Sequence, residues 1–326
     1  MRATGKLHLG NYFGAAVNFV NMQKSGEYDC YFFIADLHSL TTHTMPAELK
    51  ANTRKVLIDY LACGLDPEVS PIFVQSDIHQ IPELYLILNM FAYKGELEKT
   101  ASFKEKARKE GQTLNAGLLT YPTLMAADIL IHRAEFVPVG KDQEQHLEMT
   151  RNFAKRFNHY YETDYLPEPQ AFNFGSELVK IPGLDGSTKM SKSDSEKNAI
   201  FLGDSPEDIL KKMKRAKTDA GPQEANSEKP QEIINLFQIM NVVSANETIQ
   251  QFEDAYNDCS IRYGDMKMKI AEDAAEFLRP IRERIIELEE DDAYLEEVLQ
   301  SGAERARKSA EETIETVREI IGVRTR

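Results

Sequence analysis

The sequence of 326 residues contains no tryptophan and only three cysteines, Cys30, Cys63 and Cys259. Cysteines this far apart predict neither a zinc ribbon nor a disulfide framework, and they fit a reducing cytosol. The seven histidines include no H-E-x-x-H pair, which argues against a metalloprotease-like site, and we expect no metal site built from protein ligands. No apolar run reaches the length of a membrane span and no signal peptide opens the chain. We therefore expect a cytoplasmic protein without a membrane partner.

Positive charge is also scarce, because 39 lysines and arginines face 53 acidic residues and leave a net charge of −14. Such a charge disfavours non-specific attraction to nucleic acid, although specific binding needs only a local basic face. The densest basic cluster consists of Lys211, Lys212, Lys214, Arg215 and Lys217. It predicts either a local basic face of this kind or an ordinary solvated helix surface.

The apolar and charged fractions, 42% and 28%, are those of an ordinary globular protein with room for about two domains. Continuous apolar runs predict buried strands at residues 30–35, 71–75 and 136–139, as in a parallel sheet covered on both faces. Periodic apolar residues predict helices at 47–63, after Pro82 and after Pro122. The second half is helical, with predicted helices near 206–217, 230–242, 246–256, 264–290 and 303–321.

A lysine-bearing loop lies at residues 186–194, with the sequence G-S-T-K-M-S-K-S-D. It follows P-G-L-D-G, a run too rich in glycine and proline for a helix or a strand. Lysines place point charges on phosphoryl oxygens, serines add hydroxyl donors, and a mobile loop can close on a transition state. These features suit a polyphosphate ligand. The alternative is a solvated surface loop.

A second glycine-containing motif, T-G-K-L-H-L-G-N-Y, occupies residues 4–12 and precedes an apolar-periodic helix. Glycines allow close approach of the backbone to phosphate or ribose, and a helix N-terminus favours negative charge. In this order and at this separation, the two motifs together resemble the signature motifs of class I aminoacyl-tRNA synthetases. The stretches described below narrow the resemblance to the bacterial type of tryptophanyl-tRNA synthetase, over essentially the whole chain.

The resemblance implies a Rossmann-like parallel-sheet catalytic domain at residues 1–193 and an all-α anticodon-binding domain at 194–300. It also implies that the segment 301–326 returns as a helix to the catalytic domain. A nucleotide loop of this kind normally follows the first strand of the sheet, but only three residues precede Thr4. Either Met1 is an internal methionine of a longer protein or the chain is truncated. We expect the first, with a reading frame that continues upstream of Met1 and supplies that strand.

The stretch 118–130 carries the most information about which amino acid is bound. A helix after Pro122 would place Tyr121, Met125 and Asp128 close to one face. An indole is a large apolar body with one N–H donor and no acceptor, so apolar walls with one carboxylate are its complement. Related tyrosine enzymes carry glutamine where this chain has Met125. We therefore interpret the pocket as specific for tryptophan. A buried aspartate that caps a helix is the alternative for Asp128.

The resemblance also implies roles for individual residues. The residues expected to contact tryptophan are His38, Tyr121, Met125, Asp128, Val139 and Gln143, although His38 has the alternative of a structural histidine. The residues expected to bind ATP are Arg2, Ala3, Thr4, Gly10, Asn11, Lys104, Lys106, Gly140, Lys141, Asp142, Ile181, Lys189, Met190, Ser191, Lys192 and Ser193. Among the residues of the two motifs, those expected to act in catalysis are His8, Asn11, Lys189 and Lys192.

The expected reaction is attack of the tryptophan carboxylate on the α-phosphorus of ATP, carried with Mg²⁺, followed by transfer of tryptophan to tRNA(Trp). Expected partners are therefore tryptophan, ATP and tRNA, and not DNA. The helix after Pro82 is apolar nearly all round, so it must be covered on most sides. Core burial is one way to cover it, but the resemblance implies a homodimer interface, which is what we expect. The competing hypotheses are a tyrosine-specific synthetase and an inactive relative that binds adenylate or RNA.

Overall fold

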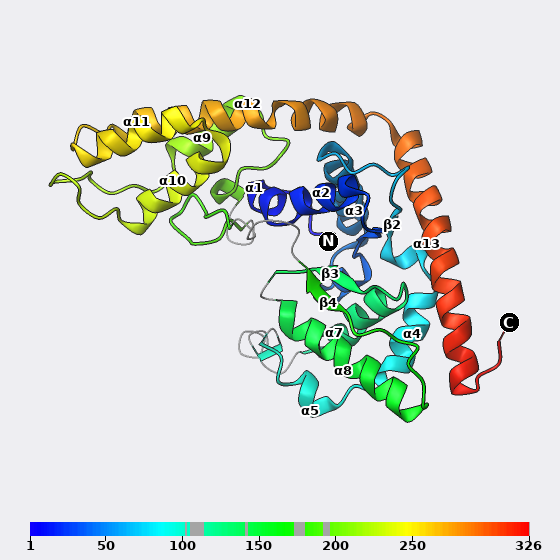
Figure 1. Cartoon of the computed structure of the whole chain (residues 1–326). Helices are drawn as coiled ribbons and strands as arrows, with labels where there is room; N and C mark the ends of the chain where they lie inside the picture. The colour runs from blue at the N-terminus through cyan, green and yellow to red at the C-terminus, as the bar shows by residue number, and fades with distance from the viewer. Residues whose placement is uncertain (102, 105–113, 141–142, 173–179, 192–195, 326) are drawn as a thin grey trace.

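The computed structural model describes residues 1–101, 103–104, 114–140, 143–172, 180–191 and 196–325 (Figure 1). Two pairs of parallel strands lie near its middle: β1 (Phe32–Ile34) pairs with β2 (Ile72–Val74), and β3 (Phe136–Pro138) pairs with β4 (Gln170–Phe172). The first three strands fall inside the apolar runs that predicted them, although each contains only three residues. The chain is thus an α/β protein with parallel strands and a helical C-terminal region, as expected.

The beginning of the chain lies against the end of β1. Arg2 forms a parallel bridge with Ala35, and Ala35 N–H donates to the Met1 carbonyl at 2.8 Å. The Met1 amine donates to the Phe33 carbonyl at 2.8 Å, and burial lowers the pKa of this amine to about 5. Residues 1–3 therefore lie beside β1 and form hydrogen bonds with it on the side away from β2.

Helices surround these strands. After α1 (Leu9–Asn11), the π-helix η1 (Tyr12–Ala16) and α2 (Val17–Ser25), the first half contains the short 3₁₀ segments η2 (Leu37–Thr42) and η3 (Gln75–Asp77) and the helices α3 (Pro46–Ala62), α4 (Gln80–Asn89), α5 (Lys94–Leu97), α7 (Ala116–Leu130) and α8 (Glu144–Tyr160). Helix α3 begins with Pro46 at its first position, where the missing N–H costs nothing. It is followed by Gly64 at φ +99°, a conformation that glycine adopts without strain.

Helix α7 corrects one prediction, because it begins at Ala116 and contains Pro122 in its interior. The side chain of Asn115 accepts a hydrogen bond from Leu118 N–H at 2.9 Å and so caps the helix earlier than expected. A proline inside a helix removes one backbone hydrogen bond, which tertiary packing can offset. Pro122 is buried here, and the helix continues through it to Leu130.

The second half contains the short segment η5 (Glu196–Asn198), followed by α9 (Pro206–Lys214), α10 (Gln231–Val243), α11 (Asn246–Asn257), α12 (Tyr263–Glu289) and α13 (Asp292–Ile321). The predicted cap of α9 is confirmed, since Ser205 Oγ accepts from Asp208 N–H at 3.1 Å. The prediction for the last helix was too short: α13 begins at Asp292, where the Asp291 side chain caps it, and not near residue 303. In Figure 1, α9, α10 and α11 gather at one end, α12 runs from there towards the start of α13, and α13 runs past β2 and α4.

Helix α13 lies directly on the edge strand of the first strand pair. A Cβ added at Gly302 would come within 2.0 Å of the Ile72 carbonyl oxygen, so the helix and strand backbones are in close contact. Arg305 and Arg307 then donate to the carbonyls of Val69 and Asp77, both at 2.9 Å. The helix therefore covers the edge of β2, which would otherwise be open to other chains. Helix α13 therefore packs on the strand region, while the three domains and their limits stay predictions.

Two apolar clusters form the core. The larger one runs from β1 and α3 through residues 181–202 into α9, α10 and α12, and the smaller one lies between β2, α4, α7, α8 and α13. Because the larger cluster is shared, the helical region packs against the strand region through continuous buried apolar surface. Among the helices in the described residues, none has both the length and the apolar character needed to cross a membrane.

Candidate active site

The first motif folds into a tight helix start built around His8. The ring Nδ1 of His8 accepts a hydrogen bond from Asn11 N–H at 3.3 Å, and Asn11 Oδ1 accepts from His8 N–H at 3.2 Å. These reciprocal bonds cap α1 at its N-terminus. Because Nδ1 accepts this hydrogen bond, a neutral His8 ring carries its proton on Nε2. The predicted catalytic pair His8 and Asn11 is therefore held in one fixed arrangement.

The two motifs, which begin at residues 4 and 186, meet at Gly10. A Cβ at this position would lie 3.0 Å from the His8 ring and 3.3 Å from the Met190 side chain, so only glycine fits without displacing either. Backbone bonds join the same segments, because Leu9 N–H donates to the Ile200 carbonyl at 2.9 Å. Met190 N–H in turn donates to the Ile181 carbonyl at 2.7 Å. The structure thus brings together Gly10, Ile181 and Met190, three residues that are predicted to bind ATP.

The lysine-bearing loop rests on a fixed base. The Asp185 carboxylate accepts from Ser187 Oγ at 2.6 Å, Ser187 N–H at 3.0 Å and Asn198 Nδ2 at 2.9 Å. The hydrogen bond from the Ser187 side chain is the main reason why the pKa of Asp185 is lowered. Asn235 in α10 donates to the Ser187 carbonyl at 3.0 Å and so ties this base to the helical region. Lys189 projects from it as an exposed side chain.

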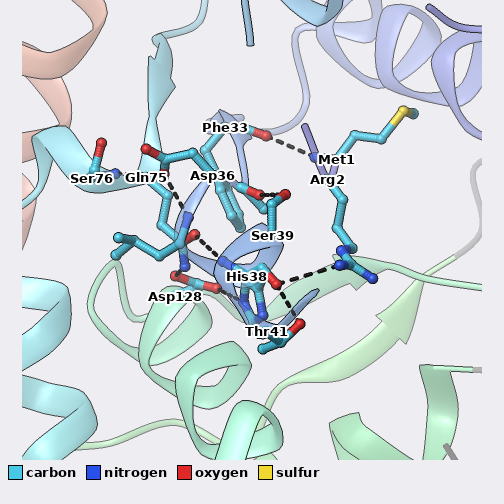
Figure 2. Close-up of polar contacts among 12 residues, drawn as sticks. Met1, Arg2, Phe33, Asp36, His38, Ser39, Thr41, Gln75, Ser76 and Asp128 are labelled. Atoms are coloured by element: carbon cyan, nitrogen blue, oxygen red, sulfur yellow. Dashed lines mark hydrogen bonds and ion pairs between the residues drawn. The ribbon is translucent and has the colours of Figure 1, made fainter. Parts of the chain in front are cut away.

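A second group of polar side chains surrounds Asp128 in α7 (Figure 2). The Asp128 side chain is almost completely buried, and its Oδ2 lies 2.8 Å from Nε2 of His38. Its Oδ1 accepts a hydrogen bond from Nε2 of Gln75 at 2.7 Å. The three residues come from different elements, η2, η3 and α7, so the carboxylate lies where the strands β1 and β2 end. The structure thus brings together His38 and Asp128, both of which are predicted to contact tryptophan.

Asp36 joins the loops that follow the two strands. Its Oδ1 accepts from Leu37 N–H at 2.8 Å and from Ser76 N–H at 3.1 Å (Figure 2). The carbonyl of His38 accepts from Thr41 Oγ1 at 2.9 Å and lies 3.4 Å from the guanidinium of Arg2. Arg2, predicted to bind ATP, therefore reaches across to the loop of His38.

Tyr121 forms the aromatic side of the same site. Its ring lies edge-on to His38, with ring centroids 6.4 Å apart, and its hydroxyl is 2.5 Å from Nε2 of the buried His146 in α8. Met125, one turn along α7, is half-buried. Tyr121, Met125 and Asp128 thus lie on neighbouring turns of one helix, with His38 facing two of them.

Some of the remaining predicted residues lie within the described part of the chain and others do not. Of those that do, Ala3 is buried, Thr4 and Lys104 are exposed, and the half-buried residues are Val139, Gly140, Gln143 and Ser191. Gln143 N–H donates to the Gly140 carbonyl at 2.9 Å at the start of α8. The predictions for Lys106, Lys141, Asp142, Lys192 and Ser193 fall outside the described residues. Within the described part of the chain, no group of three or more acidic, histidine or cysteine side chains could hold a metal ion.

Sequence reasoning missed Gln75 and His146. Gln75 is fully buried at the end of β2. Ligands bind beyond the carboxyl ends of parallel strands, and this rule, which pointed to His38 at the end of β1, applies equally to Gln75. His146 follows Gln143 by one helical turn, which places it near the site once Gln143 is assigned there. Nothing in the sequence shows that it meets Tyr121.

Comparison with known proteins identifies the family. A family model described as class I tRNA synthetases of the W and Y type matches residues 1–279. The chain is 58% identical to the tryptophan–tRNA ligase of Porphyromonas gingivalis, over 99% of this chain and 98% of that protein. The chain belongs to the tryptophan–tRNA ligase family. The same family includes the enzyme of Helicobacter pylori, which is 39% identical over 99% of this chain and 97% of its own length.

Solved structures of the tryptophan–tRNA ligase family agree with this assignment. The tryptophanyl-tRNA synthetase of Campylobacter jejuni, in complex with ADP and tryptophan, superposes with a TM-score of 0.86 and 35% identity. The match covers 99% of this chain and 98% of that chain. The tyrosyl-tRNA synthetase of Aeropyrum pernix, at 19% identity and a TM-score of 0.66, shares the fold alone. The predicted class I membership and bacterial type are therefore confirmed.

Proposed function

We propose that this protein activates tryptophan with ATP and transfers it to tRNA(Trp). The observation that carries the proposal is the buried Asp128 carboxylate on the same helix as Tyr121 and Met125, in a chain whose two nucleotide motifs meet at Gly10. The relative from Campylobacter jejuni binds ADP and tryptophan, which supports both substrates. The tryptophan carboxylate attacks the α-phosphorus of ATP, tryptophanyl-adenylate forms, and pyrophosphate leaves.

Recognition of tryptophan depends on one acceptor in an otherwise apolar or aromatic wall. Asp128 can accept the indole N–H, while Tyr121 and Met125 provide ring and thioether contacts for the indole body. His38, which faces Asp128 and Tyr121, borders the same space. A tyrosine substrate would present a hydroxyl that also needs a donor, and the Met125 thioether has none. Val139 and Gln143, at the end of β3 and the start of α8, complete the proposed substrate contacts.

ATP is proposed to lie between the first motif and the lysine loop. The His8 ring, Asn11 and the Gly10 backbone hold the adenosine and α-phosphate end. Lys189 and Lys192, together with Mg²⁺ that arrives on the nucleotide, neutralise the negative charge of the departing pyrophosphate. Catalysis is therefore positioning and charge stabilisation, with no covalent enzyme intermediate. The further proposed contacts to ATP are those of Arg2, Ala3, Thr4, Lys104, Lys106, Gly140, Lys141, Asp142, Ile181, Met190, Ser191 and Ser193.

The helical region α9 to α12 is proposed to contact the tRNA anticodon in the cytoplasm. Four residues of the basic cluster, Lys211, Lys214, Arg215 and Lys217, are exposed and available to phosphates. Lys212 is not available to phosphates, because its ammonium group forms an ion pair with the Asp204 carboxylate at 2.5 Å.

A homodimer is proposed through α4 and the residues that follow it. Leu86 in α4 and Met90 and Tyr93, which follow it, are 59%, 70% and 61% exposed, an unusual display of large apolar side chains on one short segment. Sedimentation analysis of the protein and of Met90→Glu tests this proposal. We expect a dimer that the charged substitution weakens, and a monomer at micromolar concentration would contradict it.

Aminoacylation tests the complete function. Purified protein incubated with ATP, Mg²⁺ and labelled amino acid should charge tRNA(Trp) with tryptophan, and should charge tRNA(Tyr) with tyrosine at no measurable rate. Charging with tyrosine would favour the tyrosine-specific alternative. Binding of tryptophanyl-adenylate without charging would favour an inactive relative.

A further inference from the structure

Gln75 occupies a position between the two residues that line the tryptophan site. Its side chain is completely buried and lies between the backbone of His38 and the carboxylate of Asp128 (Figure 2). Gln75 Oε1 accepts from His38 N–H at 3.4 Å, and Gln75 Nε2 donates to Asp128 Oδ1 at 2.7 Å. One amide therefore links a backbone donor in η2 to a carboxylate in α7.

The chemistry of these partners fixes the direction of the amide. The oxygen and nitrogen of a glutamine side chain are hard to distinguish by shape, so their assignment must come from the hydrogen-bonding partners. A backbone N–H can only donate, so it must face the Gln75 oxygen. The NH₂ group then faces Asp128 and can only donate, which requires Oδ1 of Asp128 to accept. Gln75 thus holds Oδ1 of Asp128 as a hydrogen-bond acceptor.

The same contacts set the orientation of the carboxylate. Asp128 receives Gln75 on Oδ1 and faces His38 Nε2 with Oδ2 at 2.8 Å, so rotation about its terminal bond would break both contacts. An ionised carboxylate has about four acceptor positions, and two of them are occupied here. The rest remain in a fixed plane for an N–H donor from a ligand.

Gln75 is itself held from two sides. Ser76 N–H, next in the chain, donates to Asp36 Oδ1 at 3.1 Å, and the Asp77 carbonyl accepts from Arg307 Nε in α13 at 2.9 Å. The segment η3 is therefore attached both to the loop after β1 and to the last helix. A side chain that positions a binding group works best when its own support is rigid.

We propose that Gln75 is a positioning residue that sets the selectivity of the site for an indole N–H. It does so by holding Asp128 as an acceptor in one orientation, without contacting the substrate itself. This inference rests on the proposed activation of tryptophan. Its consequence is that Gln75 determines how strongly tryptophan is preferred over an analogue of the same shape that lacks the N–H.

The test uses Gln75→Met, which keeps the length of the side chain and removes both hydrogen bonds. The matched control is Gln23→Met, because Gln23 is also buried and exchanges two hydrogen bonds of 2.8 Å with the backbone of Asp66, away from the site. Tryptophan-dependent ATP–pyrophosphate exchange is measured for tryptophan and for 3-benzothienyl-alanine, in which sulfur replaces the indole N–H. The melting temperature of each variant is measured in parallel.

We expect Gln75→Met to lower the ratio of kcat/KM for tryptophan over benzothienyl-alanine about tenfold or more, chiefly through the KM of tryptophan. Gln23→Met should leave this ratio within about twofold of the unsubstituted protein while losing comparable stability. An unchanged ratio in Gln75→Met, or an equal fall in both variants, would overturn the inference. If the unsubstituted protein shows no tryptophan-dependent exchange, the proposed function is wrong and the inference falls with it.

A second variant, Gln75→Glu, keeps the test decisive if Gln75→Met does not fold. Two carboxyl groups in contact share one proton at low pH and repel each other once both ionise. The titratable groups around this pair are His38, the Met1 amine, Asp77 and Asp36. The KM of tryptophan in Gln75→Glu should therefore approach the unsubstituted value near pH 6 and rise at least tenfold by about pH 9. A profile parallel to that of the unsubstituted protein would overturn the inference.

Discussion

Substitution of Gly302 with alanine should force α13 away from the sheet. The added methyl group would lie 2.0, 2.7 and 2.9 Å from the oxygen, carbon and nitrogen of Ile72, all atoms of a paired strand backbone that cannot rotate aside. Restoring an ordinary contact of 3.4 Å to the oxygen requires the helix to withdraw by about 1.4 Å (3.4 minus 2.0). The buried residues Ala303, Ala306 and Ala310 would lose packing at the same time.

The magnitude follows from two opposing terms. Overpacking of a well-packed core typically costs about 1–3 kcal/mol, and backbone against backbone belongs at the upper end. Alanine is favoured over glycine in a helix by about 1 kcal/mol, which offsets part of the cost. The net loss should be about 2 kcal/mol or more. For a domain of this size, that lowers the melting temperature by roughly 4 °C or more.

The assay is thermal unfolding by far-UV circular dichroism, with Gly264→Ala as the control. Gly264 lies in the first turn of α12, and no heavy atom lies within 4 Å of an added Cβ there. This control should melt at the same temperature as the unsubstituted protein or slightly higher. If Gly302→Ala melts at as high a temperature as the control, the protein in solution does not have the close contact between α13 and β2.

Three further predictions concern the site and the core. Asp128→Ala should weaken tryptophan binding by about 1–3 kcal/mol and reduce discrimination against phenylalanine in pyrophosphate exchange, and an unaltered ratio would remove Asp128 from the pocket. Lys192→Ala should slow adenylate formation roughly a hundredfold with little change in tryptophan affinity, so a normal rate with weaker binding would refute its role. His132 is packed on Tyr31 with ring centroids 4.7 Å apart, and burial lowers its pKa to about 4. Because the unfolded state binds this proton from about pH 6.5 downward, stability should fall between about pH 6.5 and pH 4 by on the order of 3 kcal/mol. His132→Phe should show a smaller loss of melting temperature over this window, and an identical loss would contradict the assignment.

The elements of the fold were predictable wherever the local pattern determined them. Short apolar runs located β1, β2 and β3, and the Ser205–Pro206 pair located the start of α9. The predicted start of α7 is wrong because Pro122 does not mark a helix boundary here: the Asn115 cap and the burial of Pro122 outweigh the lost hydrogen bond. The start of α13 was missed because an acidic stretch reads as surface loop, although the Asp291 side chain caps a helix there.

The candidate site was predictable to the extent that its residues stand in recognisable motifs. Tyr121, Met125 and Asp128 share helical spacing, and His38 follows a buried strand, so their proximity could be inferred. The contact between Gln75 and Asp128 could not, because it joins residues 53 positions apart through a single pair of side chains. The contact of Tyr121 with His146 has the same character. Such pairings depend on how helices pack in three dimensions, which local periodicity does not encode.

Amino-acid-dependent ATP–pyrophosphate exchange tests the central claim most directly. The purified protein is incubated with ATP, Mg²⁺ and labelled pyrophosphate, and each of tryptophan, tyrosine and phenylalanine is supplied alone. The account predicts rapid formation of labelled ATP with tryptophan and at least about a hundredfold lower kcat/KM with the other two. Exchange that is equal for the three amino acids, fastest with tyrosine, or absent with all of them would contradict it.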